Sequence, residues 1–188
     1  MGSPLPVSLG SAALALWLAF EVVLRPHRDE SRSLRTGGED RGSTYLLVAA
    51  YLIALSAPTL LPPVAPLPEA VRWAGVAVAA LGLAVRAWAM LTLGASYTRT
   101  LRTEGGQSLV TSGPYRMVRH PGYTGSLAVW VGYAATRGEG VILLGVALLL
   151  VGAYAWRIRA EEAMLAARFG AEYSDYAAHR KRLIPGLY

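Results

Sequence analysis

Long apolar blocks dominate the sequence, and short segments rich in Pro, Gly and Arg separate them. An α-helix needs about 20 apolar residues to cross the roughly 30 Å hydrocarbon core of a bilayer. Four blocks approach that length: Leu5 to Leu24, Thr44 to Leu61, Trp73 to Leu93 and Val141 to Trp156. A fifth block, Gly122 to Thr136, is shorter. The block from Gly122 to Thr136 and the block from Val141 to Trp156 would form a helical hairpin that turns at Arg137-Gly138-Glu139-Gly140. We therefore predict an all-α, polytopic membrane protein of about five transmembrane helices, with residues 1–188 in a single domain.

Basic residues concentrate in alternate connections between these blocks. Arg residues recur between residues 25 and 41, again between 99 and 119, and in the tail from 157 to 182, whereas residues 62–69 contain none. This is the positive-inside pattern of a multi-span protein. It predicts an external N-terminus, with the first and third connections and the C-terminus in the cytoplasm, as in a bacterial inner membrane. Topology thus accounts for the net charge of +6, and no nucleic-acid partner is predicted.

Composition and spacing exclude several kinds of site. The chain has no Cys, so disulfide scaffolds and thiolate nucleophiles are ruled out. His27, His120 and His179 lie far apart, and none has a second His at helical ligand spacing, so no metal site is predicted. A Gly-x-Ser-x-Gly nucleophile elbow is missing, and the glycines of the third connection do not form a dinucleotide-binding fingerprint.

Polar chemistry gathers in two segments. Residues 113–125 combine two Arg, one His and two Tyr with helix-breaking Gly and Pro, and the second segment contains Arg157, Glu161 and Glu162. Arg157 and Glu161 are four residues apart and would share a helix face. Topology puts both segments on the cytoplasmic side, where they offer cations to a carboxylate and carboxylates to an amine or a ribose. Interfacial anchoring and headgroup contacts are the alternative interpretations of these charges.

Local signals predict further features. Ser43 or Thr44 is a suitable N-cap, and Pro58 opens a proline-rich connection in which no helix should continue. An amphipathic cytoplasmic helix should begin at Arg157 and end with a C-cap at Gly170. A second short helix should run from Glu172 to about Arg182.

The third apolar block contains small residues and one charge. Gly75, Ala79, Ala80, Gly82 and Ala84 favour close helix packing, which would place this helix at the centre of the bundle. Arg86 is either a functional intramembrane charge or a residue that extends to the interface.

The combined motifs resemble a known family. Ser112-Gly113-Pro114-Tyr115-Arg116, then Arg119-His120-Pro121, Tyr123 and Gly125, look like the signature of the isoprenylcysteine carboxyl methyltransferase family. These are integral membrane enzymes that use S-adenosylmethionine and are related to phospholipid methyltransferases. The similarity continues through Glu161-Glu162-x-x-Leu165, Phe169-Gly170-x-Glu172-Tyr173-x-x-Tyr176 and Arg182-Leu183-Ile184-Pro185. Asp40-Arg41-Gly42-Ser43 and Leu93-Gly94 are similar to bacterial members, so the resemblance covers about residues 40–188, with its core motifs in residues 94–188.

The resemblance implies a cytoplasmic cofactor pocket formed by the 94–121 loop and the C-terminal helices. Arg157 matches the family's arginine at the acceptor carboxylate, and Glu161 lies beside it as a second catalytic candidate. One departure occurs: where the family places an Arg three residues after Tyr176, this chain has His179 followed by Arg180. The residues implied to hold S-adenosylmethionine are Gln107, Ser108, Leu109, Val110, Tyr115, His120, Pro121, Gly122, Tyr123 and Glu162.

The function implied is methyl transfer to a membrane-embedded acceptor, first of all the carboxylate of an isoprenylcysteine-like lipidated substrate. A phospholipid headgroup, an amine or a thiol is an alternative acceptor, and an amine would need a base such as Glu161 or Glu162. A membrane reductase of the sterol-reductase type, which uses NADPH, is an alternative of a different class. The third possibility is a non-catalytic membrane protein that keeps the fold.

Overall fold

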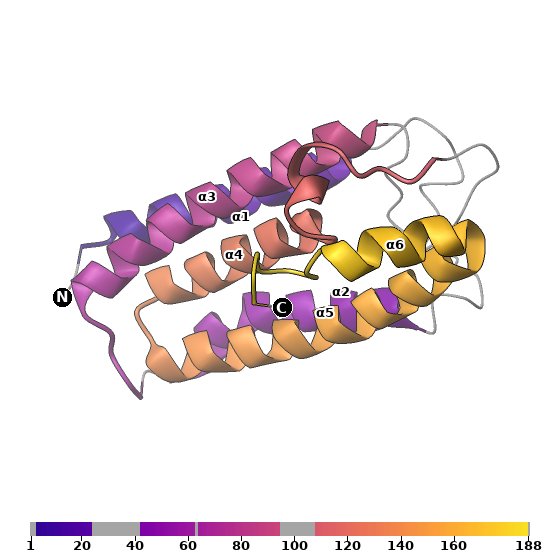
Figure 1. Cartoon of the computed structure of the whole chain (residues 1–188). Helices are drawn as coiled ribbons and strands as arrows, with labels where there is room; N and C mark the ends of the chain where they lie inside the picture. Colours follow the sequence, from indigo (N-terminus) through magenta and orange to yellow (C-terminus); the bar gives the residue numbers. More distant parts are fainter. Residues whose placement is uncertain (1–2, 24–41, 63, 95–107, 188) are drawn as a thin grey trace.

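The computed structural model describes residues 3–23, 42–62, 64–94 and 108–187, and the named elements within these ranges are all helices (Figure 1). The predicted cofactor residue Gln107 lies outside them. The elements are α1 (Leu5–Val23), α2 (Ser43–Leu60), α3 (Glu69–Leu93), the 3₁₀ helix η4 (Gly113–Arg116), α4 (Pro121–Thr136), α5 (Gly140–Phe169) and α6 (Ala171–His179). The all-α prediction is confirmed for the described residues.

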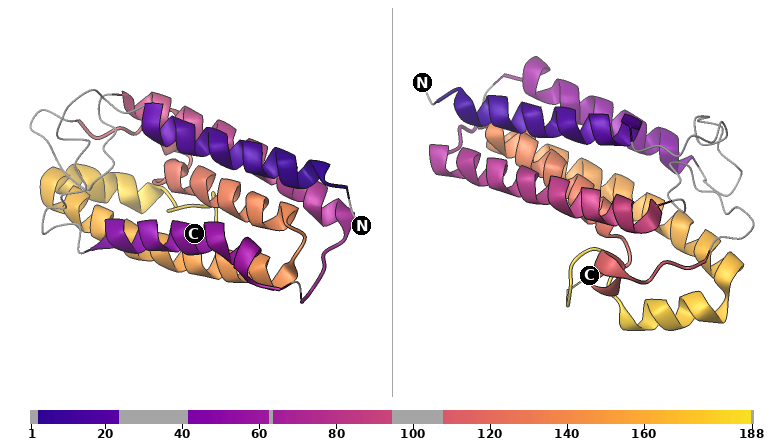
Figure 2. Two further views of the ribbon diagram at one scale, coloured as in Figure 1. Left: turned by 180° about the vertical axis from the view of Figure 1, so that it is seen from behind. Right: turned by 90° about the horizontal axis from the view of Figure 1, so that it is seen from above.

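Helix α4 lies at the centre of the bundle. Figures 1 and 2 show α4 between a layer of α1 and α3 and a layer of α2 and α5, and it contacts all four helices. The prediction that the third apolar block occupies the centre is therefore wrong. That block, α3, packs along α4 as its most extensive partner. The small residues on α3 serve this one pairing rather than a central position.

Glycines allow α3 and α4 to approach closely. A Cβ atom at Gly82 would lie 2.7 Å from the carbonyl oxygen of Gly125, and one at Gly132 would lie 2.6 Å from the backbone nitrogen of Ala79. Any side chain at these positions would force the two backbones apart. Gly75, Ala79 and Gly82 are buried in this contact, whereas Ala80 and Ala84 are exposed.

Three of the helices are long and apolar enough to cross a membrane, namely α2, α3 and α5. The apolar stretch of α1, Leu5–Glu21, is shorter, and α4 has 16 residues. Many large apolar side chains on the outer surface are exposed, among them Leu52 on α2 and Leu81 on α3. A belt of this kind suits a lipid environment. Five membrane spans remain a prediction, because length alone does not decide α1 and α4.

Several predicted helix boundaries differ from the structure. The helix α2 continues through Pro58 and ends two residues later, at Leu60. The proline is tolerated there because, near the C-terminus of a helix, it removes only one helical hydrogen bond. No separate helix starts at Arg157, since α5 runs unbroken from Gly140 to Phe169 without a Pro or an interrupting polar turn. The C-cap at Gly170 is confirmed, with φ of 53°, and α6 follows directly and ends at His179.

A buried carboxylate closes the end of the bundle at which α4 turns into α5. One oxygen of Glu139 accepts hydrogen bonds from the backbone nitrogens of Val64 and Ala65, both at 2.9 Å. The predicted turn at residues 137–140 is confirmed, and Glu139 fastens it to the connection between α2 and α3.

The α3–α4 contact can be tested with one pair of matched substitutions. Gly82→Ala should lower the free energy of unfolding by about 1–3 kcal/mol, because the new methyl group meets backbone atoms of α4. Gly145→Ala on α5 is the control, since a Cβ there has no neighbour within 4 Å. It should be neutral or stabilising by up to about 1 kcal/mol. Thermal unfolding of the purified protein in detergent measures both, and equal effects would contradict this packing.

Candidate functional site

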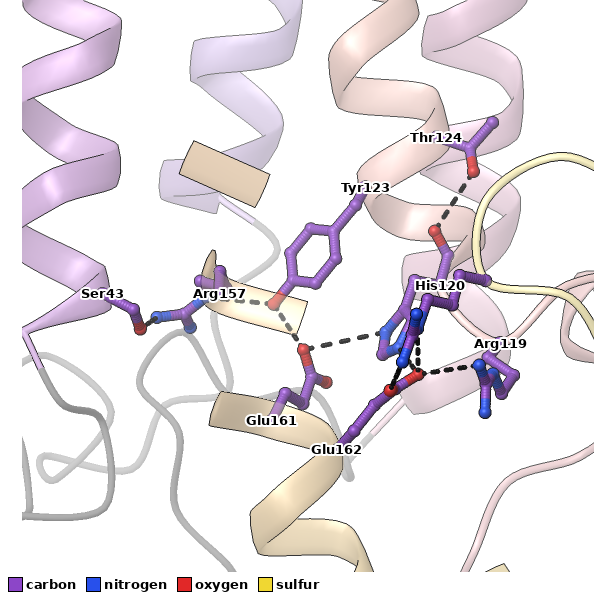
Figure 3. A network of polar contacts seen from close by, with 9 residues as sticks. Ser43, Arg119, His120, Tyr123, Thr124, Arg157, Glu161 and Glu162 are labelled. Atoms are coloured by element: carbon purple, nitrogen blue, oxygen red, sulfur yellow. Dashed lines mark hydrogen bonds and ion pairs between the residues drawn. The ribbon is translucent and has the colours of Figure 1, made fainter. Parts of the chain in front are cut away.

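Helices α4 and α5 bring the two predicted polar segments together at one end of the bundle (Figure 3). The hydroxyl group of Tyr123, in the first turn of α4, accepts a hydrogen bond from Arg157 Nε at 3.0 Å. The same hydroxyl donates to Glu161 Oε2 at 2.6 Å. Tyr123 therefore joins the guanidinium and carboxylate groups that the sequence placed on one face of a helix.

Glu162 is the centre of a second group of charges. Its carboxylate lies 3.1 Å from Arg119 Nη2, 3.2 Å from His120 Nε2 and 2.9 Å from Arg182 Nη2. On its other side, the His120 ring has Nδ1 at 3.8 Å from Glu161 Oε2. The buried imidazole thus lies between two carboxylates, and Glu162 is held by two guanidinium groups and by the ring of His120.

Arg157 is buried and is also bound by the N-terminus of α2. Its Nη1 donates to Thr44 Oγ1 at 2.8 Å and to Ser43 Oγ at 3.2 Å. The prediction that Ser43 or Thr44 caps α2 is wrong: Gly42 is the N-cap residue, and no side chain caps the helix. The hydroxyl groups serve the guanidinium instead, because hydrogen bonds from a charged donor are stronger than those from a neutral amide.

The C-terminal segment holds the start of α4 in place. The backbone nitrogens of Arg119 and His120 donate to the carbonyl oxygens of Lys181 and Arg182, at 2.8 and 2.9 Å. Thr124 Oγ1 donates to the carbonyl oxygen of Leu183 at 2.8 Å. Pro121 occupies the first helical position, where its missing N–H costs nothing. His120 and Tyr123 are therefore positioned by a segment about 60 residues away in the sequence.

Arg86 supports the first turn of α4 from α3. It is buried and pairs with Glu21 on α1, with Arg86 Nε at 2.9 Å from Glu21 Oε1. Its Nη1 atom lies 2.6 Å from where a Cβ atom of Gly122 would be, so Gly122 makes room for the guanidinium. Arg86 therefore does not extend to the interface, and its charge is balanced inside the bundle.

Helix α6 contacts the site through η4. The hydroxyl group of Tyr176 donates to the carbonyl oxygen of Tyr115 at 2.7 Å. Burial raises the pKa of Tyr176 to about 12, which extends the pH range over which this bond keeps its proton. Tyr115 is itself buried in η4.

The structure thus unites part of the predicted site. His120, Tyr123, Arg157, Glu161 and Glu162 form one network, and Pro121 and Gly122 lie in the helical turn between its members. In the part of the chain that the structure describes, this network does not extend to Ser108, which is exposed, or to Leu109 and Val110, which are half-buried. Their assignment to a cofactor stays a prediction, as does that of Tyr115.

Sequence reasoning did not assign roles to several residues of this region. The sequence places Arg119 in the polar segment 113–125 without a specific partner, Arg182 in a motif alone, and Ser43 and Thr44 as possible caps. Glu21 carried a usable signal, because two opposite charges isolated in apolar helices are expected to pair. Among the described residues no group of three His, Asp or Glu side chains is arranged to hold a metal ion.

A bundle of apolar helices with a buried network of charges at one end defines a polytopic integral membrane protein that carries a polar site at that end. Residues 75–167 match the model of the isoprenylcysteine carboxyl methyltransferase (ICMT) family. The match confirms, over these residues, the resemblance seen in the sequence.

Curated relatives carry the corresponding name. A probable protein-S-isoprenylcysteine O-methyltransferase of Oryza sativa subsp. indica is 35% identical over 109 residues, which is 57% of this chain and 57% of the relative. Protein-S-isoprenylcysteine O-methyltransferase B of Arabidopsis thaliana is 34% identical over 105 residues, or 55% of this chain and 53% of that protein. The chain thus spans little more than half the length of these relatives.

A solved structure has the same fold. It is described as the eukaryotic intramembrane Ras methyltransferase ICMT without a monobody. The match has a TM-score of 0.67 at 23% identity, and it covers 100% of this chain and 70% of that one.

The role of Glu162 in this network can be tested by removing its charge. Glu162→Gln should destabilise the protein by about 1–3 kcal/mol, because Arg119, His120 and Arg182 lose their shared carboxylate. Glu172→Gln, the same change at an exposed site on α6, should have little effect. Thermal unfolding in detergent compares the two variants, and an unchanged Glu162→Gln midpoint would refute the network's structural importance.

Proposed function

We propose that this protein transfers a methyl group from S-adenosylmethionine to the carboxylate of an isoprenylcysteine-like, lipidated acceptor in the membrane. The observation that carries the proposal is Arg157, buried and fixed in orientation by Tyr123 and by the hydroxyl groups of α2. A planar guanidinium group can meet both oxygens of a carboxylate. The family match of residues 75–167 and the names of the relatives support the same activity.

The described side chains fit the proposed cofactor. S-adenosylmethionine carries a positive sulfonium and ammonium group, and two carboxylates, Glu161 and Glu162, lie next to each other in the site. His120 and Tyr123 add hydrogen-bonding groups and a stacked pair of rings with centroids 5.6 Å apart. We assign the amino-acid end of the cofactor to His120, Tyr123 and Glu162. By the family resemblance, residues 107–110, Tyr115, Pro121 and Gly122 would complete the pocket.

Methyl transfer to a carboxylate does not require a general acid or a general base. When bound, S-adenosylmethionine supplies an electrophilic methyl group on its sulfonium. A carboxylate acceptor with an ordinary pKa near ~4 is already ionised at neutral pH, so no base needs to activate it. Arg157 would orient that carboxylate, and Glu161 would hold Tyr123 and face the acceptor beside Arg157. Catalysis would then rest on positioning and on exclusion of water.

We propose a cytoplasmic site and an external N-terminus. In Figure 1 the start of α1 and the α5–α6 junction lie at opposite ends of the bundle, as this orientation requires. A lipidated acceptor would enter sideways from the bilayer, and the cofactor would enter from the cytoplasm.

Calorimetry with S-adenosylhomocysteine and with NADPH separates the proposed class from its alternatives. The purified protein in detergent should bind S-adenosylhomocysteine and not NADPH. Binding of NADPH alone would indicate a reductase, and binding of neither would indicate a non-catalytic protein. Either result would refute the proposal.

Arg157 should be required for methyl transfer. Arg157→Ala should lower kcat/KM for a short S-farnesylcysteine substrate by about 100-fold or more, equivalent to roughly 2.7 kcal/mol of lost transition-state stabilisation. Arg159→Ala, two residues away on the exposed side of α5, is the control and should keep the parent rate. Equal rates for all three proteins, measured with labelled S-adenosylmethionine, would remove Arg157 from the mechanism.

Thr44 should act by positioning Arg157. Thr44→Val keeps the shape of the side chain and removes the acceptor of the 2.8 Å hydrogen bond, so kcat should fall by about 10-fold. The dissociation constant for S-adenosylhomocysteine should not change, because Thr44 contacts Arg157, which we assign to the acceptor rather than to the cofactor. Thr59→Val, at the exposed far end of α2, is the control. A loss of cofactor binding in Thr44→Val with kcat retained would contradict the assigned role.

A further inference from the structure

A cavity lies beside the charge network, on the side where the C-terminal segment leaves α6. Its volume is about 300 Å³. Five of its lining residues are basic, and in the described part of the chain no Asp or Glu contributes to the lining: Arg119, His179, Arg180, Lys181 and Arg182. Such a surface attracts an anion.

Two carboxylates lie close to lining residues, and together they do not neutralise the lining: Asp175 Oδ1 lies 3.7 Å from His179 Nδ1, and Glu162 pairs with Arg119 and Arg182. Glu162 contacts Arg119 and Arg182, so one carboxylate faces two guanidinium groups, in addition to His120. Arg119 also keeps a buried Nε that has no hydrogen-bond partner among the described residues. Arg180 and Lys181 lie on the exposed side of the cavity and add two further positive charges.

The cavity is built on a fixed piece of backbone. Val118 and Lys181 form a parallel bridge, and the backbone nitrogens of Arg119 and His120 donate to the tail. Buried Leu183 anchors the same segment in the core of the bundle. The basic side chains of residue 119 and of residues 180–182 therefore project from two backbone segments that are hydrogen-bonded to each other, rather than from independent loops.

Apolar residues beside the cavity indicate where its ligand comes from. Leu187 lines it and is 73% exposed, and Ile184 on the same segment is 49% exposed. Basic side chains next to exposed aliphatic ones are typical of a surface that lies at the headgroup level of a membrane.

We propose that this cavity binds a phosphate group, and that the phosphate is the headgroup of an anionic phospholipid. This site is separate from the methyl-transfer site, although Arg119 and Arg182 reach both. Because the tail is hydrogen-bonded to Arg119 and His120, a bound phosphate would stabilise the segment that holds the start of α4.

Native mass spectrometry of the full chain with defined lipids tests the proposal. The protein should retain phosphatidylglycerol in preference to phosphatidylcholine. Each basic side chain near a membrane surface contributes about a 5-fold gain in affinity for anionic lipid, so Arg180→Gln with Lys181→Gln should weaken retention roughly 25-fold. The double variant Arg159→Gln with Arg168→Gln removes the same charge from exposed positions on α5 and should change retention little.

Four outcomes are decisive. Selective loss in the Arg180/Lys181 variant supports a lipid headgroup site. Equally tight binding of inorganic phosphate, lost in the same variant, supports the phosphate site and identifies a free phosphate as its source. Equal weakening in both double variants would overturn the proposal, because it would reduce the effect to general surface charge. Loss of S-adenosylhomocysteine binding with lipid retention unchanged would also overturn it, by assigning the cavity to the cofactor.

Discussion

The close approach of α3 and α4 is the constraint on which the site depends. Gly82 and Gly125 let the two backbones touch, and Gly122 continues the same contact by admitting the guanidinium group of Arg86 beneath the first turn of α4. That turn carries His120 and Tyr123, so the distance between α3 and α4 sets where both rings lie. The Arg86–Glu21 pair then links α1 to this arrangement within the bundle.

The packed helices bring together charged side chains from distant parts of the sequence, and Tyr123 and Glu162 each contact more than one of them. Tyr123 connects Arg157 with Glu161, and Glu162 connects His120 with Arg182. Buried charges are strongly destabilising when a partner is lost. The network is therefore a structural element as well as a candidate site, and substitutions in it require a measurement of folding beside any measurement of activity.

Apolar block length was enough to predict most of the helices, because it depends on local composition alone. The alternation of basic connections put residues 113–125 on the same side of the membrane as Arg157 and the two Glu, and the structure brings these segments together. The contacts of Ser43 and Thr44 with Arg157 could not be predicted, because they join residues more than 110 positions apart. The central position of α4 was missed for a related reason: glycines on both partners matter, and the small residues of α3 were considered alone. The unbroken α5 was missed because a change from apolar to charged residues does not end a helix.

If Arg157 presents a carboxylate to a methyl donor, the methylated atom is a carboxylate oxygen, and the identity of that atom is the most direct test. The purified protein should be incubated with methyl-labelled S-adenosylmethionine and an S-farnesylcysteine that has a blocked amine and a free carboxylate. The predicted product is a methyl ester, which releases the label as methanol in mild base. Label that resists base, or equal labelling of the corresponding amide without a carboxylate, would contradict the account.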